Sequence, residues 1–188
     1  MKRIILLVSL LGYLYSSIGQ TPTAAPELSN LMKLDLGLQG IGFTYETRLS
    51  KKITVDLSAG AGGGYDIAEG SIKYRVYFLK PAFYFSVTPK YFYNRHSRSL
   101  KEKTTHLNSG NYFGIRLKYI TPNDKKTDCT RNSILVNAHW GVQRAFDSHW
   151  IFNAHAGVGY AQDIDYGFGT IYPSIDVKIS YALVNLKK

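Results

Sequence analysis

The sequence predicts an all-β protein, and more specifically an eight-stranded antiparallel up-and-down transmembrane β-barrel. Several segments alternate apolar and polar residues with a period of two, which places the apolar side chains on one face of a strand. An N-terminal stretch has the features of a secretory leader, and no later segment is apolar enough to span a membrane as a helix. An exported chain with this alternation along its length is typical of a bacterial outer-membrane barrel.

Residues 1–19 form the predicted signal peptide. Lys2 and Arg3 give the positive start, an apolar stretch follows, and small residues precede the expected cleavage site before Gln20. The apolar stretch is too short for a spanning helix, which needs about 20 residues. We expect 20–30 to be a mobile N-terminal tail and 31–188 to be the barrel, exported to the outer membrane.

The charge of the exported chain excludes some partners. Without Lys2 and Arg3, 21 Lys and Arg face 13 Asp and Glu, a net formal charge of +8. Because an exported chain does not normally meet nucleic acid, we expect outer-membrane lipids, including lipopolysaccharide, as the counter-charge. Cys129 is the single cysteine, which excludes an intramolecular disulfide and predicts an idle thiol.

The alternation predicts eight strands and no helix. Their ranges are 31–38, 41–49, 52–65, 75–94, 111–121, 133–145, 149–162 and 172–185. The apolar face changes at Gln39-Gly40, which fits either one bulged strand or a tight hairpin between two strands. We prefer the hairpin because it gives the even strand number of single-chain bacterial barrels and places both termini on the periplasmic side.

Loop lengths test that orientation, because periplasmic turns are expected to be short and outer loops longer. The connections at 66–74, 122–132 and 162–173 are long and are predicted to face outward. Two connections do not fit: Gln39-Gly40 is short for an outer loop, and 95–110 is long for a periplasmic one. The side that 95–110 faces therefore stays open.

Five short motifs give the chain a family likeness. They are Arg48–Lys52 at a hairpin, Pro89–Asn94 closing a strand, Asn108–Tyr112 opening the next, Trp140–Arg144 and Gly157–Tyr160. With them the chain resembles the small outer-membrane β-barrel superfamily of Gram-negative bacteria, the OmpA/OmpX-like barrels and their relatives. The resemblance implies an eight-stranded monomer that the barrel-assembly machinery inserts, and it implies no activity. Such barrels usually end on an aromatic residue, and here Tyr181 would have to serve.

If the apolar residues face lipid, charged residues face a lumen that is just wide enough for side chains to fill. The predicted lumen network is Lys33, Asp35, Glu46, Arg48, Asp56, Lys90, Arg116, Lys118, His139, His155, Asp176 and Lys178. Its cations and anions nearly match, which predicts a self-paired network that plugs the barrel and fixes strand register. The alternative is a cationic passage or pocket for an anion, supported by two surplus cations. Leu135 and Ile151 also fall on the inward face, which favours a packed interior.

His139 and His155 share the inward face of consecutive strands. A three-residue turn at 146–148 would pair Arg144 with Trp150 and set the two histidines opposite each other, close enough to share a hydrogen bond or a metal. Because no third ligand is evident, we expect two neutral imidazoles in a polar core, with no metal and no cofactor.

The strongest charge feature is a basic loop between two predicted strands. It contains Arg95, His96, Arg98, Lys101 and Lys103. We expect a solvated loop. The alternative is phosphate contact, with lipopolysaccharide if the loop faces outward and with peptidoglycan-side or periplasmic partners if it faces inward.

No catalytic constellation emerges from the sequence. Ser148 and His149 are neighbours in one turn, and adjacent turn residues seldom point at each other. The sequence therefore predicts a small non-enzymatic outer-membrane barrel with a plugged polar lumen and a structural or surface-interaction role. The alternatives are a barrel that transports or senses a small ligand or ion, and a soluble lipocalin-like barrel whose apolar residues face inward.

Overall fold

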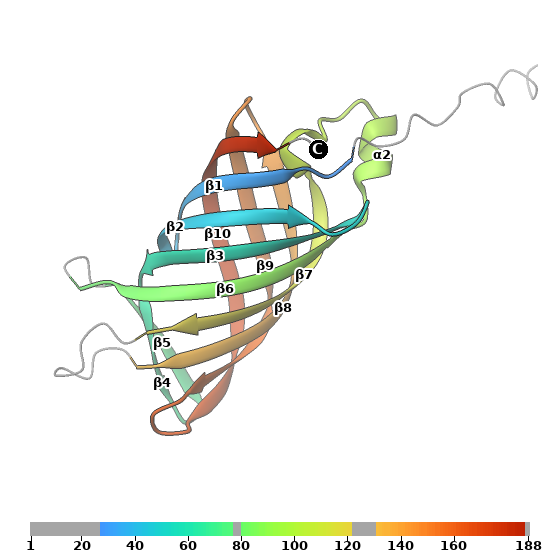
Figure 1. The fold of residues 1–188 in the computed structure, drawn as a ribbon. Coiled ribbons are helices and arrows are strands. Elements are labelled where there is room, and N and C mark those ends of the chain that lie inside the picture. The colour runs from blue at the N-terminus through green and yellow to red at the C-terminus, as the bar shows by residue number, and fades with distance from the viewer. Residues whose placement is uncertain (1–26, 77–79, 122–130, 187–188) are drawn as a thin grey trace, which may run out of the picture.

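The computed structural model describes residues 27–76, 80–121 and 131–186, which form a closed antiparallel β-barrel of eight strands (Figure 1). Around the barrel the order is β1-β10-β9-β8-β7-β6-β3-β2, so neighbours in sequence are neighbours in space apart from the hairpin β4–β5, which forms a separate two-stranded sheet. The barrel strands are β1 (Asn30–Gly37), β2 (Gly40–Arg48), β3 (Ile53–Gly62), β6 (Ala82–Phe92), β7 (Gly110–Ile120), β8 (Ser133–Ala145), β9 (Trp150–Asp163) and β10 (Gly169–Leu186).

The predicted hairpin at Gln39-Gly40 is confirmed. β1 and β2 are separate strands that pair up to Gly37 and Gly40. Gly40 has a φ of +112°, a conformation open to glycine and strained for other residues. The strand number is therefore eight, and the pairing of Asn30 with Leu186 closes the barrel.

The barrel has two distinct ends. The terminal end holds the beginning of β1, the end of β10 and the segment between β6 and β7 (Figure 1). The opposite end, called the hairpin end here, holds β4 (Gly64–Ala68) and β5 (Ser71–Arg75) (Figure 1). Segment 95–110, whose side stayed open in the sequence, thus lies at the same end as the start of β1 and the end of β10.

Two predicted strand ranges were wrong. The strand expected over 75–94 begins only at Ala82, and β5 belongs to the β4–β5 hairpin, where an outer loop over 66–74 was expected. The reason is the barrel pairing: β3 and β6 separate after Gly62 and Ala82, and the chain beyond pairs with itself. β10 also starts three residues earlier than predicted, at Gly169.

The expectation of no helix was also wrong. The segment between β6 and β7 contains α2 (Arg95–Leu100) and the short 3-10 helix η1 (His106–Asn108). A helix of one to two turns is too short to produce a clear apolar period in a sequence. No helix in the described part of the chain is long and apolar enough to cross a membrane.

The barrel strands bury one face and expose the other. In β7, for example, Lys118 is 2% exposed while its neighbour Leu117 is 53% exposed. Inside the barrel, polar residues fill the middle and apolar clusters lie at both ends. The predicted parity of apolar and charged residues is therefore present in the structure, and Leu135 and Ile151 do lie inside, each 1% exposed.

The predicted tail over 20–30 is described only from Glu27 onward, and this last part is packed. Leu28 is buried beside Phe92 and Tyr112, and Ser29 donates its N–H to Asn108 Oδ1 at 2.8 Å. Asn30 already belongs to β1. The predicted signal peptide and Cys129 lie outside the described residues.

Candidate functional site

The terminal half of the lumen holds a compact group of four charged side chains. Lys33 Nζ lies 2.7 Å from Glu46 and 3.6 Å from Asp56, and Lys90 Nζ lies 2.6 Å from Asp56 and 3.9 Å from Glu46. All four are at most 4% exposed. Because each cation contacts both anions, this part of the predicted network is self-paired across β1, β2, β3 and β6.

Gln143 completes that group from the far wall. Its side-chain nitrogen donates to Glu46 at 3.1 Å and its oxygen accepts from Lys90 at 3.1 Å. Gln143 was not among the residues predicted to face the lumen. Gln143 shares the inward parity of His139 on β8, so applying the same rule to uncharged polar residues would have found it.

The middle of the lumen contains two further ion pairs. Lys178 Nζ lies 2.6 Å from Asp35, which also accepts a hydrogen bond from Thr44 at 2.6 Å. Arg116 lies 3.3 Å from Asp176. These pairs also belong to the predicted network.

Lys118 is the exception among the inward cations. It is 2% exposed, yet no described carboxylate lies within ion-pair distance of it. Its ammonium donates to the side-chain oxygen of Gln39 and lies 4.5 Å from the ring centre of Tyr84 and 5.8 Å from that of Tyr65. These contacts stabilise the ammonium group through a hydrogen bond and aromatic rings, but none of them carries a negative charge that would balance it.

Arg48 does not join the lumen network as predicted. It stands at the terminal end of β2, is partly exposed, and forms an ion pair with Glu27. The reason is its place in the strand: the inward parity holds, but the position is already at the rim of the barrel. The hydrogen bond from Arg48 lowers the pKa of Glu27 below its usual value.

The two histidines do come together, although the predicted register was wrong. The turn after β8 is longer than three residues, so His139 pairs with Gly157 and His155 with Gly141. The rings are diagonal neighbours, 4.1 Å apart between centres and tilted by 31°. His139 Nδ1 lies 2.7 Å from Asn137 Oδ1.

Around this pair the structure shows a polar core. Tyr112 packs edge-on against His139 and donates to Asn153 at 2.9 Å across the lumen. A Cβ at Gly141 would lie 2.4 Å from the Tyr112 ring, so glycine is needed there. Among the described residues no cluster of three His, Cys, Asp or Glu side chains is placed to hold a metal ion.

The basic loop is partly structural. Arg95 is 4% exposed and donates to the carbonyl oxygens of Thr105 and Glu27; burial lowers its pKa to about 10. Arg98 donates to the Thr104 carbonyl at 2.9 Å. These two arginines bind backbone, contrary to the expectation of a solvated loop. The remaining members, His96, Lys101 and Lys103, are exposed.

The same segment fills the terminal end of the lumen. Leu107 of η1 is 3% exposed and packs against Leu31, Ile151 and Ala182. Its carbonyl accepts a hydrogen bond from Gln143 at 3.1 Å. At the hairpin end Ile67 is fully buried in an apolar cluster with Ala82, Tyr84, Ile120, Leu135, Ala161 and Tyr172. Neither Leu107 nor Ile67 was predicted to close an end of the barrel, since both lie in predicted loops.

Ser148 and His149 do point at each other, against expectation. Ser148 Oγ lies 2.8 Å from His149 Nδ1 in the exposed turn after β8. His149 stacks on Tyr181 with ring centres 5.4 Å apart, and this packing orients the imidazole. Among the described residues no carboxylate is hydrogen-bonded to His149, so the pair lacks the third group of a triad.

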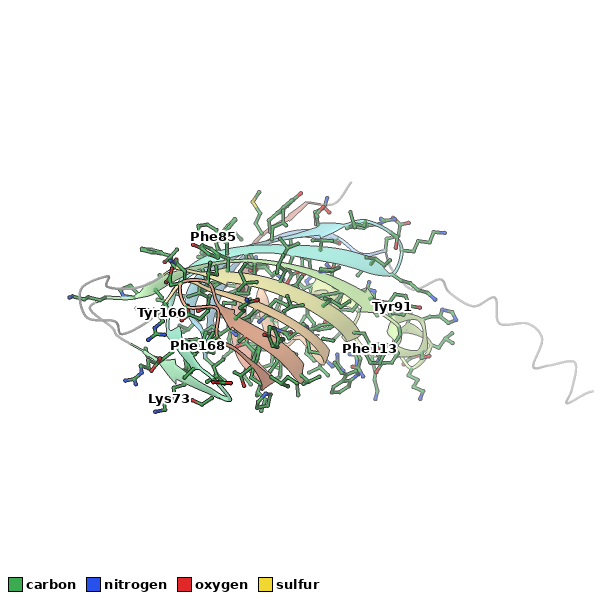
Figure 2. All side chains as sticks on the ribbon, turned by 90° about the horizontal axis from the view of Figure 1, so that it is seen from below. Lys73, Phe85, Tyr91, Phe113, Tyr166 and Phe168 are labelled. Carbon is green, nitrogen blue, oxygen red and sulfur yellow. The ribbon has the colours of Figure 1, made fainter. Side chains whose placement is uncertain are left out.

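The outer surface of the barrel is apolar and carries aromatic residues toward both ends. Figure 2 shows Phe85, Tyr166 and Phe168 toward the hairpin end and Tyr91 and Phe113 toward the terminal end. Aliphatic residues lie between these bands, among them Leu57, Val87, Ile115, Leu117, Val136 and Val177.

These features define the class of the protein: a closed eight-stranded antiparallel β-barrel with an apolar outer face and a charged, ion-paired interior. Comparisons with protein-family models, with curated proteins and with solved structures found no match.

Proposed function

We propose that the protein is an integral outer-membrane β-barrel whose polar lumen is plugged and forms no wide pore, and whose role is structural or lies in contacts at the membrane surface, without catalysis. The observation that carries this proposal is the inverted polarity of the barrel. Charges such as Lys33 and Glu46 are buried inside, while Leu117 and Val136 are exposed outside. A soluble ligand-binding barrel would have the opposite arrangement.

The aromatic bands and the barrel height support a bilayer. The outward Phe83 of β6 and the outward Tyr93, which directly follows β6, are ten positions apart. At about 3.3 Å per residue and a tilt of about 40°, that is roughly 25 Å along the barrel axis. The apolar band of outer-membrane barrels is about 25 Å tall and flanked by aromatic girdles. Outer-membrane lipids are therefore the proposed partners, and the barrel inserts as a monomer.

The filled interior supports a closed lumen. Eight strands leave an interior that side chains can fill, and here the ion-paired core lies between Leu107 at one end and Ile67 at the other. In planar bilayers the purified protein is expected to show no steady conductance of porin size. Stable large openings in most insertions would overturn the closed lumen.

Membrane insertion is tested with a pair of substitutions to arginine. Val177 faces outward in mid-barrel, and Leu49 is exposed in the turn between β2 and β3 at the terminal end. In lipid vesicles Val177→Arg should destabilise the barrel by about 2–4 kcal/mol, and Leu49→Arg by about 0–1 kcal/mol. Urea titrations of the folded protein in vesicles measure both.

A soluble barrel gives a different result. Exposed surface substitutions in water usually change stability by no more than about 0.5 kcal/mol, so the two variants would then be alike. Membrane-fraction protein is also expected to migrate differently on gels when heated. Recovery of the protein in the soluble periplasmic fraction would overturn the proposal.

A further inference from the structure

The barrel wall is uneven where its first and last strands meet. β1 has 8 residues and β10 has 18. At the hairpin end the last bond between them runs from the N–H of Leu38 to the carbonyl of Val177, at 3.1 Å. From Gly169 to Asp176, β10 pairs with β9 alone. The wall therefore has a notch beside β10.

Pro173 suits this unpaired edge. The Val177 carbonyl points toward β1, and the N–H and C=O of a strand residue point to the same side, alternating along the strand. Pro173 and Ile175 thus present their backbone to the notch. Proline has no N–H to leave without a partner, so it is compatible with a strand edge that stays open.

The β4–β5 hairpin covers the notch incompletely. Tyr74 donates its hydroxyl to the Leu38 carbonyl at 2.8 Å, and the rings of Tyr65 and Tyr172 lie 6.4 Å apart. Behind these contacts remains a pocket of about 410 Å³, within the range of small-molecule sites.

The lining of this pocket combines apolar, aromatic and charged residues. Its outer part is formed by Leu38, Pro173 and Ile175, which are exposed on the outer face of the barrel. Its inner part is formed by lumen residues, and aromatic rings lie between the two. The inner and aromatic residues are Arg116, Lys118, Leu135, Asn137, Ser174, Tyr65, Tyr74 and Tyr172, and Gln39 and Ile72 complete the lining.

The inner part has an excess of positive charge. Arg116 lies 3.3 Å from Asp176, whereas Lys118 has no described carboxylate within ion-pair distance and contacts Gln39 and aromatic rings. The other lysines inside the barrel, Lys33, Lys90 and Lys178, each lie within 2.7 Å of a carboxylate. A ligand that carries an anion would supply what Lys118 lacks.

We propose that this notch is a lateral binding site for an anionic amphiphile, a molecule with one apolar chain and a carboxylate or phosphate head. The head lies against Lys118, with Arg116 beside it. The chain leaves between Leu38 and Ile175 along the outer face, which is the bilayer if the proposed membrane location holds. This inference rests on the proposed function, which does not specify a ligand, and it names the class of that ligand.

The test uses the purified full chain refolded in a neutral detergent, with a fluorescent long-chain fatty acid as the probe. Lys118→Gln should weaken probe binding by about tenfold or more, since it removes one charge-assisted contact. Gln39→Glu should weaken it similarly, because the new carboxylate pairs with Lys118 in place of the ligand. Lys73→Gln is the matched control: Lys73 is exposed on β5 of the same hairpin (Figure 2) and does not line the pocket. It should leave binding unchanged.

Head-group specificity is tested with a fluorescent fatty alcohol that has the same hydrocarbon chain as the fatty-acid probe. The alcohol should bind at least about tenfold more weakly than the acid. Equal binding of acid and alcohol would overturn the proposal. So would unchanged binding in both Lys118→Gln and Gln39→Glu.

Two competitors distinguish the sources of the ligand. In phosphatidylcholine vesicles, displacement of the probe by an anionic phospholipid in the bilayer supports a membrane lipid, and displacement by added dodecyl phosphate alone supports a ligand from the aqueous phase. Displacement by inorganic phosphate as effective as that by dodecyl phosphate would overturn an amphiphile site.

Gel migration of the same sample reports insertion separately: inserted protein without probe binding overturns this inference and leaves the proposed function standing. Binding in detergent by protein that does not insert into vesicles overturns the membrane function and leaves the pocket standing.

Discussion

The two halves of the lumen are built from the same residue types on the same inward parity, yet they differ in charge balance. In the terminal half, Lys33 and Lys90 share Glu46 and Asp56. In the hairpin half, Lys118 is buried without a described carboxylate. The difference teaches that parity decides which residues enter the barrel, whereas cross-strand neighbours decide whether a buried charge is structural or available to a ligand.

The largest expected effect is in the terminal half. Glu46→Gln removes a carboxylate that Lys33, Lys90 and Gln143 all contact, and leaves two buried lysines with Asp56 alone. Breaking such a buried pair typically costs about 3–5 kcal/mol, which urea titration in detergent or vesicles would measure. Glu69→Gln, an exposed control, should stay within about 0.5 kcal/mol. Equal stability of the two variants would contradict a structural role for the terminal group.

The second largest effect is expected at Leu107, which closes the terminal end of the lumen. Leu107→Ala removes the buried side chain that packs on Leu31 and Ile151, and should destabilise the barrel by about 2–5 kcal/mol. Leu100, 56% exposed at the end of α2, is the matched control, and Leu100→Ala should have little effect. If both variants were as stable as the unaltered chain, the segment between β6 and β7 would be a loose cover and no part of the core.

In the hairpin half, removal of a buried charge should raise the free energy of unfolding, whereas in the terminal half it should lower it. Lys118→Met keeps most of the side-chain volume and removes a buried charge that has no described anion. Without ligand we expect a gain in unfolding free energy on the order of 1 kcal/mol, because desolvation of the ammonium is relieved. A loss of several kcal/mol in the same urea titration would mean that Lys118 is as much a structural cation as Lys33, and would remove the contrast between the halves.

The smallest effect is expected at the terminal rim. Arg48 lowers the pKa of Glu27, so the stabilisation from this pair is present above the usual glutamate pKa and is lost as the pH falls through the lowered value. The pair is exposed and screened by salt. Stability curves of the unaltered chain and Glu27→Gln should therefore differ slightly at neutral pH and low salt and converge in acid. A difference that grows toward acid would contradict the sign of this pKa shift.

The sequence predicted the barrel well because its signal is local. Alternation of apolar and polar residues is set by strand geometry, so the ranges 133–145 and 111–121 came out within one residue of β8 and β7. The inward charges followed from the same parity, and of the predicted charged network only Arg48 lies at the rim.

Prediction failed where structure depends on distant partners. The β4–β5 hairpin forms because β3 and β6 separate, and the residues of the hairpin do not predict where that separation occurs. Register failed by two residues between β8 and β9, since parity alone allows every shift by two. The histidines met nevertheless, because diagonal neighbours across a ladder are within reach of aromatic rings.

By itself, then, the sequence determined an eight-stranded barrel, which side chains face inward, and the hairpin at Gln39-Gly40, because period-two alternation and turn residues are local properties of the chain. Only the tertiary structure decided that Leu107 and Ile67 close the two ends, that Lys33 shares Glu46 with Lys90, and that β10 outruns β1 beside Lys118. These features arise when the barrel closes, since closure alone fixes which strands meet, in what register, and where an edge is left without a partner.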